Sequence, residues 1–351
     1  MTLLEIEDLK VFYRTSTGEC QAVDGVSFAV EEDECLGVVG ESGCGKSTVV
    51  KAILGILPPN GWVPAGEIRF KGRDILSLNS TDLRRLRWKE ISLISQSAMN
   101  ALDPVYRVGD QVIESMLAHE KIGADEARRR TESLFELVGL DSGRTREYPH
   151  QFSGGMRQRV MIAMALSLDP TLILADEPTT GLDVITQHSI LQKMRDLRRE
   201  LKKSMLLVTH NMAVVAENCN RMVVMYAGKV MEIGPTEQVL RSSHNPYTLG
   251  LHNAFPSLRE EKTLISIPGA PPTLVDPPPG CRFHDRCPFQ TDSCVQEEPP
   301  LVEVADGQFT ACHERMRIEE IRELAKQREL WLALSPARGR DRKWLFESAA
   351  R

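Results

Sequence analysis

The sequence predicts an α/β protein with a mainly parallel sheet, followed by a smaller irregular C-terminal part. Three observations lead to this prediction. Short apolar runs alternate with helical patterns up to about residue 240, as in strands joined by helical crossovers. The segment 267–283 holds six prolines in seventeen residues, which excludes regular helix or sheet there. Four of the eight cysteines then fall within residues 281–312.

The predicted strands of the first part are three buried apolar runs, CLGVV (35–39), TLILAD (171–176) and SMLLVTH (204–210). A helix is predicted at residues 124–140, with Asp125 as its cap and Gly139 near its end. A helical pattern resumes from Glu314, and the chain ends in a basic stretch that we expect to be a solvated tail.

Composition bounds the function and the location. Net charge is -6, so there is no overall basic field to hold nucleic acid. No apolar run is long enough to span a bilayer, and the first ten residues lack the basic start and apolar core of a signal peptide. We therefore expect a cytoplasmic location, where disulfides are rare and clustered cysteines indicate metal binding or redox chemistry.

The segment GESGCGKST (40–48) fits the pattern of a phosphate-binding loop, because it follows a predicted strand and precedes a predicted helix. Its glycines let backbone N–H groups point at phosphate oxygens, and the helix N-terminus adds positive potential. Lys46 can reach the β- and γ-phosphates, and the Ser47 hydroxyl can bind Mg²⁺. A flexible glycine turn is the alternative. The predicted nucleotide-binding positions of this loop are Gly40, Ser42, Gly43, Cys44, Gly45, Lys46, Ser47 and Thr48.

Two carboxylates follow the strand LILAD at residues 172–176. Asp176 ends the strand and can hold Mg²⁺ through water, whereas Glu177 can polarise an attacking water. A pair of carboxylates at an exposed strand end is the alternative, and the upstream phosphate loop makes it the weaker one.

The segment QFSGGMRQRV (151–160) places Ser153, Gly154 and Gly155 at the start of a helix, which is another anion-binding arrangement. With it, six motifs occur in the order and approximate spacing of the ABC transporter ATPases, and the sequence resembles that family. The motifs are the phosphate loop, Gln96 in LISQ, FSGGMRQR, LILADEP, TTGLD and His210 in LLVTH.

The resemblance implies a P-loop NTPase fold, with a RecA-like core and a helical signature subdomain. ATP would lie between two such domains packed head to tail, with Lys46 and Ser47 of one facing Ser153, Gly154 and Gly155 of the other. Glu177 would be the general base and His210 would contact the γ-phosphate. Gln96 would bind Mg²⁺ together with Ser47 and link the site to a membrane partner. Tyr13 resembles the aromatic that stacks on adenine, and the adjacent Phe12 could take that role instead.

Residues 242–258 resemble the start of a C-terminal extension found in dipeptide and oligopeptide importers, and residues 54–75 resemble the D-type of their two ATPases. The predicted parts are an ATPase domain at 1–241, an extension at 242–315 and a helical, basic tail at 316–351. Implied partners are two transmembrane permease subunits, a second ATPase subunit that is an F-type sister or a second copy, and indirectly an extracellular solute-binding protein, with no nucleic acid. The expected location is peripheral, on the cytoplasmic face of the cell membrane.

The implied function is ATP hydrolysis that powers import of di- or oligopeptides. The same role for an oligosaccharide or a nickel chelate is an alternative. A soluble ABC ATPase acting on DNA or ribosomes fits less well, because the chain has one ATPase unit, no heptad run and negative net charge. A metal-dependent regulatory protein is a further alternative.

The four clustered cysteines are Cys281, Cys287, Cys294 and Cys312. Four cysteines suit a tetrahedral zinc site or an iron–sulfur cluster, but the spacing is awkward for zinc and matches neither ferredoxin pattern. His284 or His313 could replace one of them, and buried thiols without a metal are the alternative. The family resemblance implies a [4Fe-4S] cluster, with Zn²⁺ as the second choice, that staples the irregular extension to the ATPase.

The other cysteines are expected to be ordinary. Cys20, Cys35 and Cys219 should pack as small apolar residues. Cys44 lies inside the phosphate loop, so a thiol modifier is expected to block ATP binding there.

Overall fold

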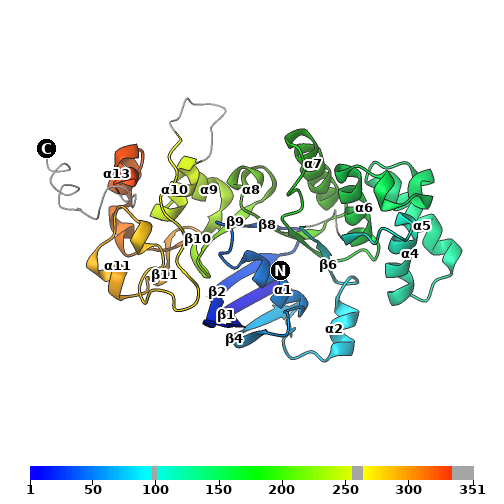
Figure 1. The fold of residues 1–351 in the computed structure, drawn as a ribbon, viewed down its shortest axis with the longest axis horizontal. Helices are drawn as coiled ribbons and strands as arrows, with labels where there is room; N and C mark the ends of the chain where they lie inside the picture. Colours follow the sequence, from blue (N-terminus) through cyan, green and yellow to red (C-terminus); the bar gives the residue numbers. More distant parts are fainter. Residues whose placement is uncertain (97–100, 255–263, 334–351) are drawn as a thin grey trace.

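The computed structural model describes residues 1–96, 101–254 and 264–333. Its centre is an eight-stranded sheet with the order β11-β12-β10-β9-β3-β8-β7-β6, and a four-stranded sheet with the order β2-β1-β4-β5 lies beside it (Figure 1). The strands of the central sheet are β3 (Cys35–Val39), β6 (Ile91–Ile94), β7 (Leu172–Asp176), β8 (Ser204–Thr209), β9 (Arg221–Tyr226), β10 (Lys229–Pro235), β11 (Leu301–Ala305) and β12 (Gln308–Ala311). Those of the second sheet are β1 (Thr2–Thr15), β2 (Gly18–Glu31), β4 (Gly61–Phe70) and β5 (Arg73–Asp74).

The five strands from β9 to β6 are parallel to one another, which confirms the predicted parallel α/β core. The three predicted strands correspond to β3, β7 and β8, and every residue in them is buried. Parallel strands covered on both faces are expected to be continuously apolar, as these are.

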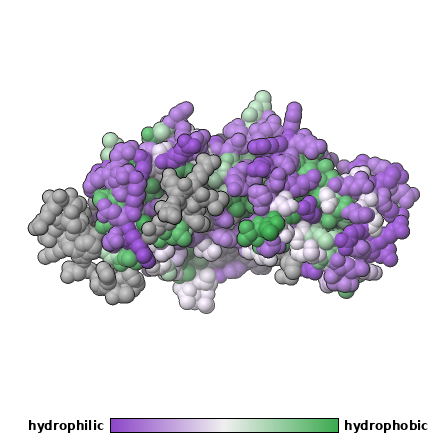
Figure 2. Space-filling model, turned by 90° about the horizontal axis from the view of Figure 1, so that it is seen from above, coloured by the Kyte–Doolittle hydropathy of each residue, from purple (hydrophilic) through white to green (hydrophobic). Residues whose placement is uncertain are grey.

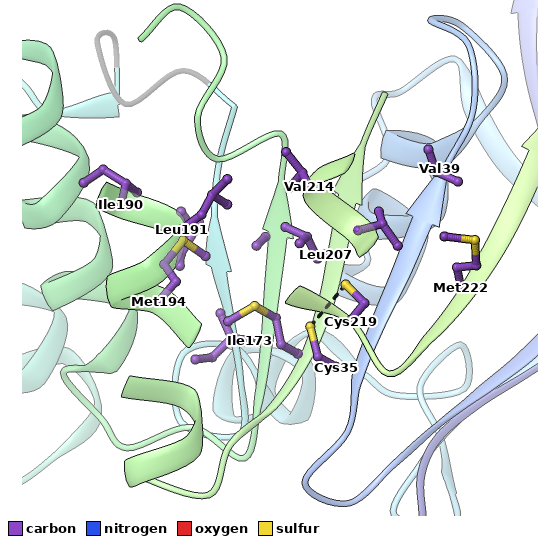
Figure 3. Close-up of a cluster of buried hydrophobic side chains, with 14 of the residues drawn as sticks. Cys35, Val39, Ile173, Ile190, Leu191, Met194, Leu207, Val214, Cys219 and Met222 are labelled. Atoms are coloured by element: carbon purple, nitrogen blue, oxygen red, sulfur yellow. Dashed lines mark hydrogen bonds between the residues drawn. The ribbon is translucent and has the colours of Figure 1, made fainter. Parts of the chain in front are cut away.

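The helices of the ATPase part are α1 (Lys46–Leu54), α2 (Ser80–Leu86), α4 (Val108–His119), α5 (Ala124–Leu137), α6 (Gly154–Leu166), α7 (Val184–Glu200), α8 (Met212–Asn218) and α9 (Thr236–Arg241), with 3₁₀ turns η1 (Ser142–Arg146) and η2 (Pro149–Gln151). Helix α10 (Pro246–Ala254) follows at the start of the predicted extension. Figure 1 shows α4, α5 and α6 gathered at one end of the molecule. On one face of the central sheet, Ile190, Leu191 and Met194 of α7 belong to the same buried cluster as Ile173 and Leu207 (Figure 3).

The predicted helix at 124–140 is α5, but its cap was predicted wrongly. The residue at the N-cap is Gly123, and Asp125 lies in the first turn, where its charge favours the helix dipole without capping. Gly139 has a φ of 77°, so it adopts the left-handed conformation that ends a helix.

The C-terminal extension lies at the opposite end from α4, α5 and α6 (Figure 1). Its short helical elements are η3 (His284–Arg286), α11 (Asp292–Gln296), η4 (His313–Arg317), α12 (Ile318–Leu324) and α13 (Arg328–Leu332). The proline-rich segment contains no helix or strand, as predicted. The β11–β12 hairpin was not predicted; it extends the central sheet because β12 pairs antiparallel with β10. The basic end of the predicted tail lies outside the described residues.

One buried carboxylate joins the extension to the ATPase. Glu232 of β10 is fully buried and accepts hydrogen bonds from Ser243 Oγ at 2.7 Å, His244 N at 2.6 Å and Gln308 Nε2 at 2.9 Å. Burial raises its pKa above the ordinary value for a glutamate.

Among the described helices none is long and apolar enough to cross a membrane. The face seen in Figure 2 is largely hydrophilic, with smaller hydrophobic areas between.

Candidate functional site

The predicted site residues meet at one edge of the central sheet. The phosphate loop follows β3, and His210, Glu177 and Gln96 follow β8, β7 and β6. These four strands are adjacent and parallel. Their carboxyl ends therefore share one edge, which is where ligands bind in open α/β sheets.

The phosphate loop needs glycine at two closely packed positions. A Cβ on Gly40 would lie 2.1 Å from the carbonyl oxygen of Met225, and a Cβ on Gly45 would lie 2.2 Å from that of Ala22. Gly45 also has a φ of 103°, a conformation that side chains disfavour. The loop is thus wrapped closely against neighbouring backbone and leads directly into α1.

Lys46 lies inside the curve of this loop and is only 4% exposed. Its Nζ donates hydrogen bonds to the carbonyl oxygens of Gly40 at 2.8 Å and Glu41 at 2.9 Å, and lies 3.6 Å from Cys44 Sγ. The ammonium group is therefore held at the centre of the loop by weak neutral acceptors, which phosphate oxygens could replace at little cost.

Ser47 and Asp176 form the second part of the site. Ser47 Oγ donates a hydrogen bond to Asp176 Oδ1 at 2.9 Å. Burial raises the pKa of Asp176, and the hydrogen bond from Ser47 opposes that shift. A hydroxyl and a carboxylate oxygen are donors that Mg²⁺ prefers, so this pair fits the metal that the phosphate loop implies.

Glu177 lies at the centre of a third group of site residues. Its carboxylate accepts hydrogen bonds from Gln96 Nε2 at 3.1 Å and Thr180 Oγ1 at 2.9 Å, and lies 3.3 Å from His210 Nδ1. The φ of Glu177 is 46°, which is unusual for a residue that carries a side chain. Its backbone N–H donates a hydrogen bond to the carbonyl oxygen of Val208 at 2.8 Å. The three residues predicted to be catalytic are thus brought into direct contact, and Thr180 is a partner that sequence reasoning missed, although it lies in the TTGLD motif.

Ser153 and Gly155 of the FSGGMRQR segment lie at the start of α6. Ser153 is the N-cap of α6, and its Oγ accepts a hydrogen bond from Met156 N at 3.4 Å. A Cβ on Gly155 would lie 2.5 Å from Thr186 Cγ2. Gly154 and Gly155 lie in the first turn of α6, where backbone N–H groups have no partner within the helix, so their anion-binding role stays a prediction.

Tyr13 reaches the beginning of α1, because its hydroxyl donates a hydrogen bond to Thr48 Oγ1 at 3.3 Å. Phe12 lies on the other face of β1, with its ring edge-on to Trp62 at 6.0 Å between centroids. Of the two candidates for stacking on adenine, Tyr13 is the one next to the phosphate loop.

The four clustered cysteines line one small pocket of the extension. Burial raises the pKa of Cys281 to about 11 and that of Cys312 to about 12, and it also raises the pKa of Cys287 well above its ordinary range. Cys294 completes the set. The described residues contain no group of three or more histidine, cysteine or acidic side chains arranged to hold a metal ion, so the metal part of the sequence prediction goes beyond what the described structure supports.

The two histidines beside these cysteines have other partners. A ring nitrogen of His284 lies 2.7 Å from the carbonyl oxygen of Cys281, and one of His313 lies 2.9 Å from that of Glu297. Each contact uses one ring nitrogen and fixes the ring, as is also usual for a histidine that binds a metal through its other nitrogen. Both histidines line the same pocket as the cysteines, so the alternative of a histidine ligand stays a prediction.

Three of the four remaining cysteines are buried, whereas Cys20, which was also expected to pack as a small apolar residue, is only half-buried. Cys35 and Cys219 are buried with their sulfurs 3.4 Å apart, as Figure 3 shows. Cys44 is only 3% exposed and burial raises its pKa, so the expected ready reaction with thiol modifiers is not supported by its surroundings.

Two family models match the chain: "ABC transporter" over residues 23–180 and "Oligopeptide/dipeptide transporter, C-terminal region" over residues 231–294. Similar curated proteins include the oligopeptide transport ATP-binding protein OppD of Bacillus subtilis (strain 168), 42% identical over 88% of this chain and 87% of that protein. OppD of Escherichia coli (strain K12) is 43% identical over 88% of this chain and 92% of its own length. The dipeptide transport ATP-binding protein DppD of Bacillus subtilis is 43% identical over 88% and 94%.

Solved structures agree on the fold. The dimeric post-hydrolysis structure of the ATP-binding cassette MJ0796 with ADP and Pi is 26% identical, with a TM-score of 0.60 over 66% of this chain and 98% of that chain. The cbiO1 protein from Clostridium perfringens, part of an ABC transporter complex, has the same TM-score and identity over 69% and 91%.

Proposed function

The chain belongs to the ATP-binding proteins of the oligopeptide and dipeptide ABC transporters, and from this premise we propose that it hydrolyses ATP to power import of di- or oligopeptides. The observation that carries the proposal is the contact of Glu177 with both Gln96 and His210, beside the Ser47–Asp176 pair and the phosphate loop. Hydrolysis of ATP needs a base, a pair of Mg²⁺ ligands and a phosphate cradle side by side, and the contacts of these residues support that assignment.

Each group has a role that follows from its position. The loop N–H groups and Lys46 bind the β- and γ-phosphates, and Ser47 and Asp176 hold Mg²⁺. Mg²⁺, when bound, neutralises charge on those phosphates. Glu177 accepts the proton of the attacking water, and His210 and Gln96 contact its carboxylate. When nucleotide and metal are bound, His210 would contact the γ-phosphate and Gln96 would join Ser47 as a ligand of Mg²⁺.

The site is completed by a second ATPase subunit, either an F-type sister or another copy. Ser153, Gly154 and Gly155 of that subunit would supply the helix start that faces the γ-phosphate. In this chain, Val184 and Ile185 follow the TTGLD loop and are 79% and 83% exposed. Exposed apolar side chains next to a site are typical of a surface covered by a partner.

The permease subunits would dock on a groove between α4, α6 and the segment before β6. This groove is lined by residues that include Trp88, Tyr106, His119 and Met164. The Tyr106 side chain is exposed there, so an inserted helix would find an aromatic contact. We assign the chain to the cytoplasmic face of the membrane, with the solute-binding protein contacting only the permeases.

We also propose that Cys281, Cys287, Cys294 and Cys312 hold a [4Fe-4S] cluster, with Zn²⁺ as the alternative. The four cysteines line one pocket. Burial alone favours their neutral thiols, and a bound metal cation would stabilise the thiolates that ligate it. The metal would staple a segment with little regular structure to the ATPase. Iron and sulfide analysis with a visible spectrum tests this, and a colourless protein with stoichiometric zinc would overturn the iron assignment.

The transport proposal is tested with the chain assembled with its two permeases in liposomes. Peptide uptake should require internal ATP and should stop in the Lys46→Ala variant. If the assembled complex hydrolyses ATP but takes up an oligosaccharide or a nickel chelate and no peptide, the solute assignment is wrong.

A further inference from the structure

An arginine of the C-terminal extension forms an ion pair with a residue of the phosphate loop. Arg286 is buried, and its Nη1 and Nη2 lie 2.6 Å and 2.9 Å from the two carboxylate oxygens of Glu41. Glu41 is the second residue of the loop, 245 positions earlier in the chain. Bidentate arginine–carboxylate pairs are both strong and geometrically specific, so this contact fixes the loop relative to the extension.

Arg286 is itself held in place on its other sides. Its Nε donates to the carbonyl oxygen of Pro268 at 2.9 Å, and its Nη1 donates to the Tyr226 hydroxyl at 3.1 Å. The guanidinium also lies 5.6 Å from the centre of the Tyr226 ring. The arginine is therefore pre-oriented toward Glu41.

Glu41 passes this restraint to Lys46 through its backbone. Its N–H donates to the Tyr247 hydroxyl at 3.1 Å, and its carbonyl oxygen accepts a hydrogen bond from Lys46 Nζ at 2.9 Å. The side chain, N–H and carbonyl of one loop residue are thus each bonded to a different group. Where Glu41 lies decides where the Lys46 ammonium lies.

The same arginine is tied directly to the cysteine pocket. Arg286 ends η3, the single turn that joins Cys281 to Cys287. That turn is closed at one end by His284 N bonding Cys281 at 2.9 Å and at the other by Cys287 N bonding His284 at 3.1 Å. A change in the arrangement of these two cysteines must therefore move Arg286.

We propose that Arg286 is a positioning residue for nucleotide binding, and that through it the four-cysteine pocket sets the affinity of the phosphate loop for ATP. The inference rests on the proposed nucleotide site at that loop. With the Arg286–Glu41 pair made, the loop stays in its binding geometry. Without the pair the loop samples other geometries, and apparent affinity falls by the fraction that remains competent, about tenfold if about a tenth does.

The test measures binding of a fluorescent ATP analogue to the full-length chain, with thermal unfolding of each variant recorded without nucleotide. Arg286→Ala is expected to weaken binding about tenfold and to raise KM while kcat at saturating ATP changes about twofold or less. Arg286→Lys keeps the charge and loses the bidentate geometry, so it should fall between. Glu41→Gln removes the charge while keeping the shape, and should weaken binding as Arg286→Ala does even if the latter folds poorly.

Arg282→Ala is the matched control. Arg282 is a buried arginine of the same segment, next to Cys281, but its guanidinium bonds Asp24 at 2.6 Å instead of a loop side chain. It should lose thermal stability while keeping nucleotide affinity within about twofold of wild type. An equal loss of affinity in Arg282→Ala would reduce the effect to general loosening and overturn the assignment.

The link to the cysteines is tested by a double-mutant cycle. Cys287→Ser should weaken nucleotide binding in the wild-type chain and add nothing in the Arg286→Ala background. Fully additive effects would overturn the coupling, and a folded Arg286→Ala that binds like wild type would overturn the positioning role. Lys46→Ala distinguishes failure of the nucleotide site from failure of the Arg286 inference. If Lys46→Ala binds the analogue normally, the proposed nucleotide site is wrong. If Lys46→Ala loses binding and the Arg286 variants do not, only the inference about Arg286 fails.

Discussion

Replacing Glu177 by glutamine should remove ATP hydrolysis while leaving the site intact. The two bonds accepted by its Oε2, from Gln96 at 3.1 Å and Thr180 at 2.9 Å, can both be accepted by a glutamine oxygen. The amide group would then face His210 Nδ1, 3.3 Å from the present Oε1, and can donate to it. The variant therefore keeps its contacts and loses only the basic carboxylate.

The expected magnitude follows from that single loss. A positioned general base contributes about 10²–10⁴-fold to the rate, so kcat should fall by that factor, about 3–5 kcal/mol in the barrier. ATP binding should persist, and because hydrolysis no longer opens the dimer, the ATP-bound dimer should accumulate.

The assay is phosphate release by the assembled transporter, with dimerisation followed by size-exclusion chromatography in ATP. Glu217→Gln is the matched control, since Glu217 is another carboxylate beside a histidine, His188, at 4.0 Å, and it is exposed. That control should hydrolyse ATP normally. If Glu177→Gln keeps a rate within about tenfold of wild type, the assignment of the base is wrong.

Three further perturbations test other parts of the structure. Gly40→Ala should abolish binding of a fluorescent ATP analogue, because its Cβ would lie 2.1 Å from the Met225 carbonyl oxygen; normal binding would contradict the loop geometry. The pKa of Glu232 is raised by burial, so the folded state binds this proton more tightly than the unfolded state does. The proton's contribution to the free energy of unfolding is complete below about pH 4.5 and is lost as pH rises through the folded pKa. Urea unfolding from pH 4 to 8 should therefore show wild type losing stability relative to Glu232→Gln, and parallel curves would refute this. Cys44 should react with a maleimide more slowly than the half-buried Cys20, as mass spectrometry of the labelled native chain would show.

The parts of the site that lie at the ends of adjacent strands could be predicted from the sequence. Each motif has a local signature, and the parallel order of β3, β8, β7 and β6 then brings their ends together without any further information. The contact of Gln96 and His210 with Glu177 is a consequence of that topology. The roles of these residues stay predictions.

Other features had no local signal. The Arg286–Glu41 pair joins two ordinary charged residues 245 positions apart, and nothing near either one marks it. Asp125 was expected to cap a helix because aspartate is a common cap, but the N-cap is Gly123, two residues earlier, so Asp125 lies within the first turn. The strands of the β11–β12 hairpin are only five and four residues long, LVEVA and QFTA, so they are too short for their periodicity to be told from loop.

The pairing of β12 with β10 means that the ATPase cannot be cut cleanly from the C-terminal extension. Glu232 and Ile233 of β10 face Thr310 and Phe309 of β12 across the ladder. A chain ended at residue 241 would leave β10 as an exposed edge strand with unpaired amides and carbonyls, and such an edge favours aggregation by pairing with strands of other chains. Swapping C-terminal segments between related ATPases is therefore an exchange of sheet strands, and the exchanged piece must match the register of its host.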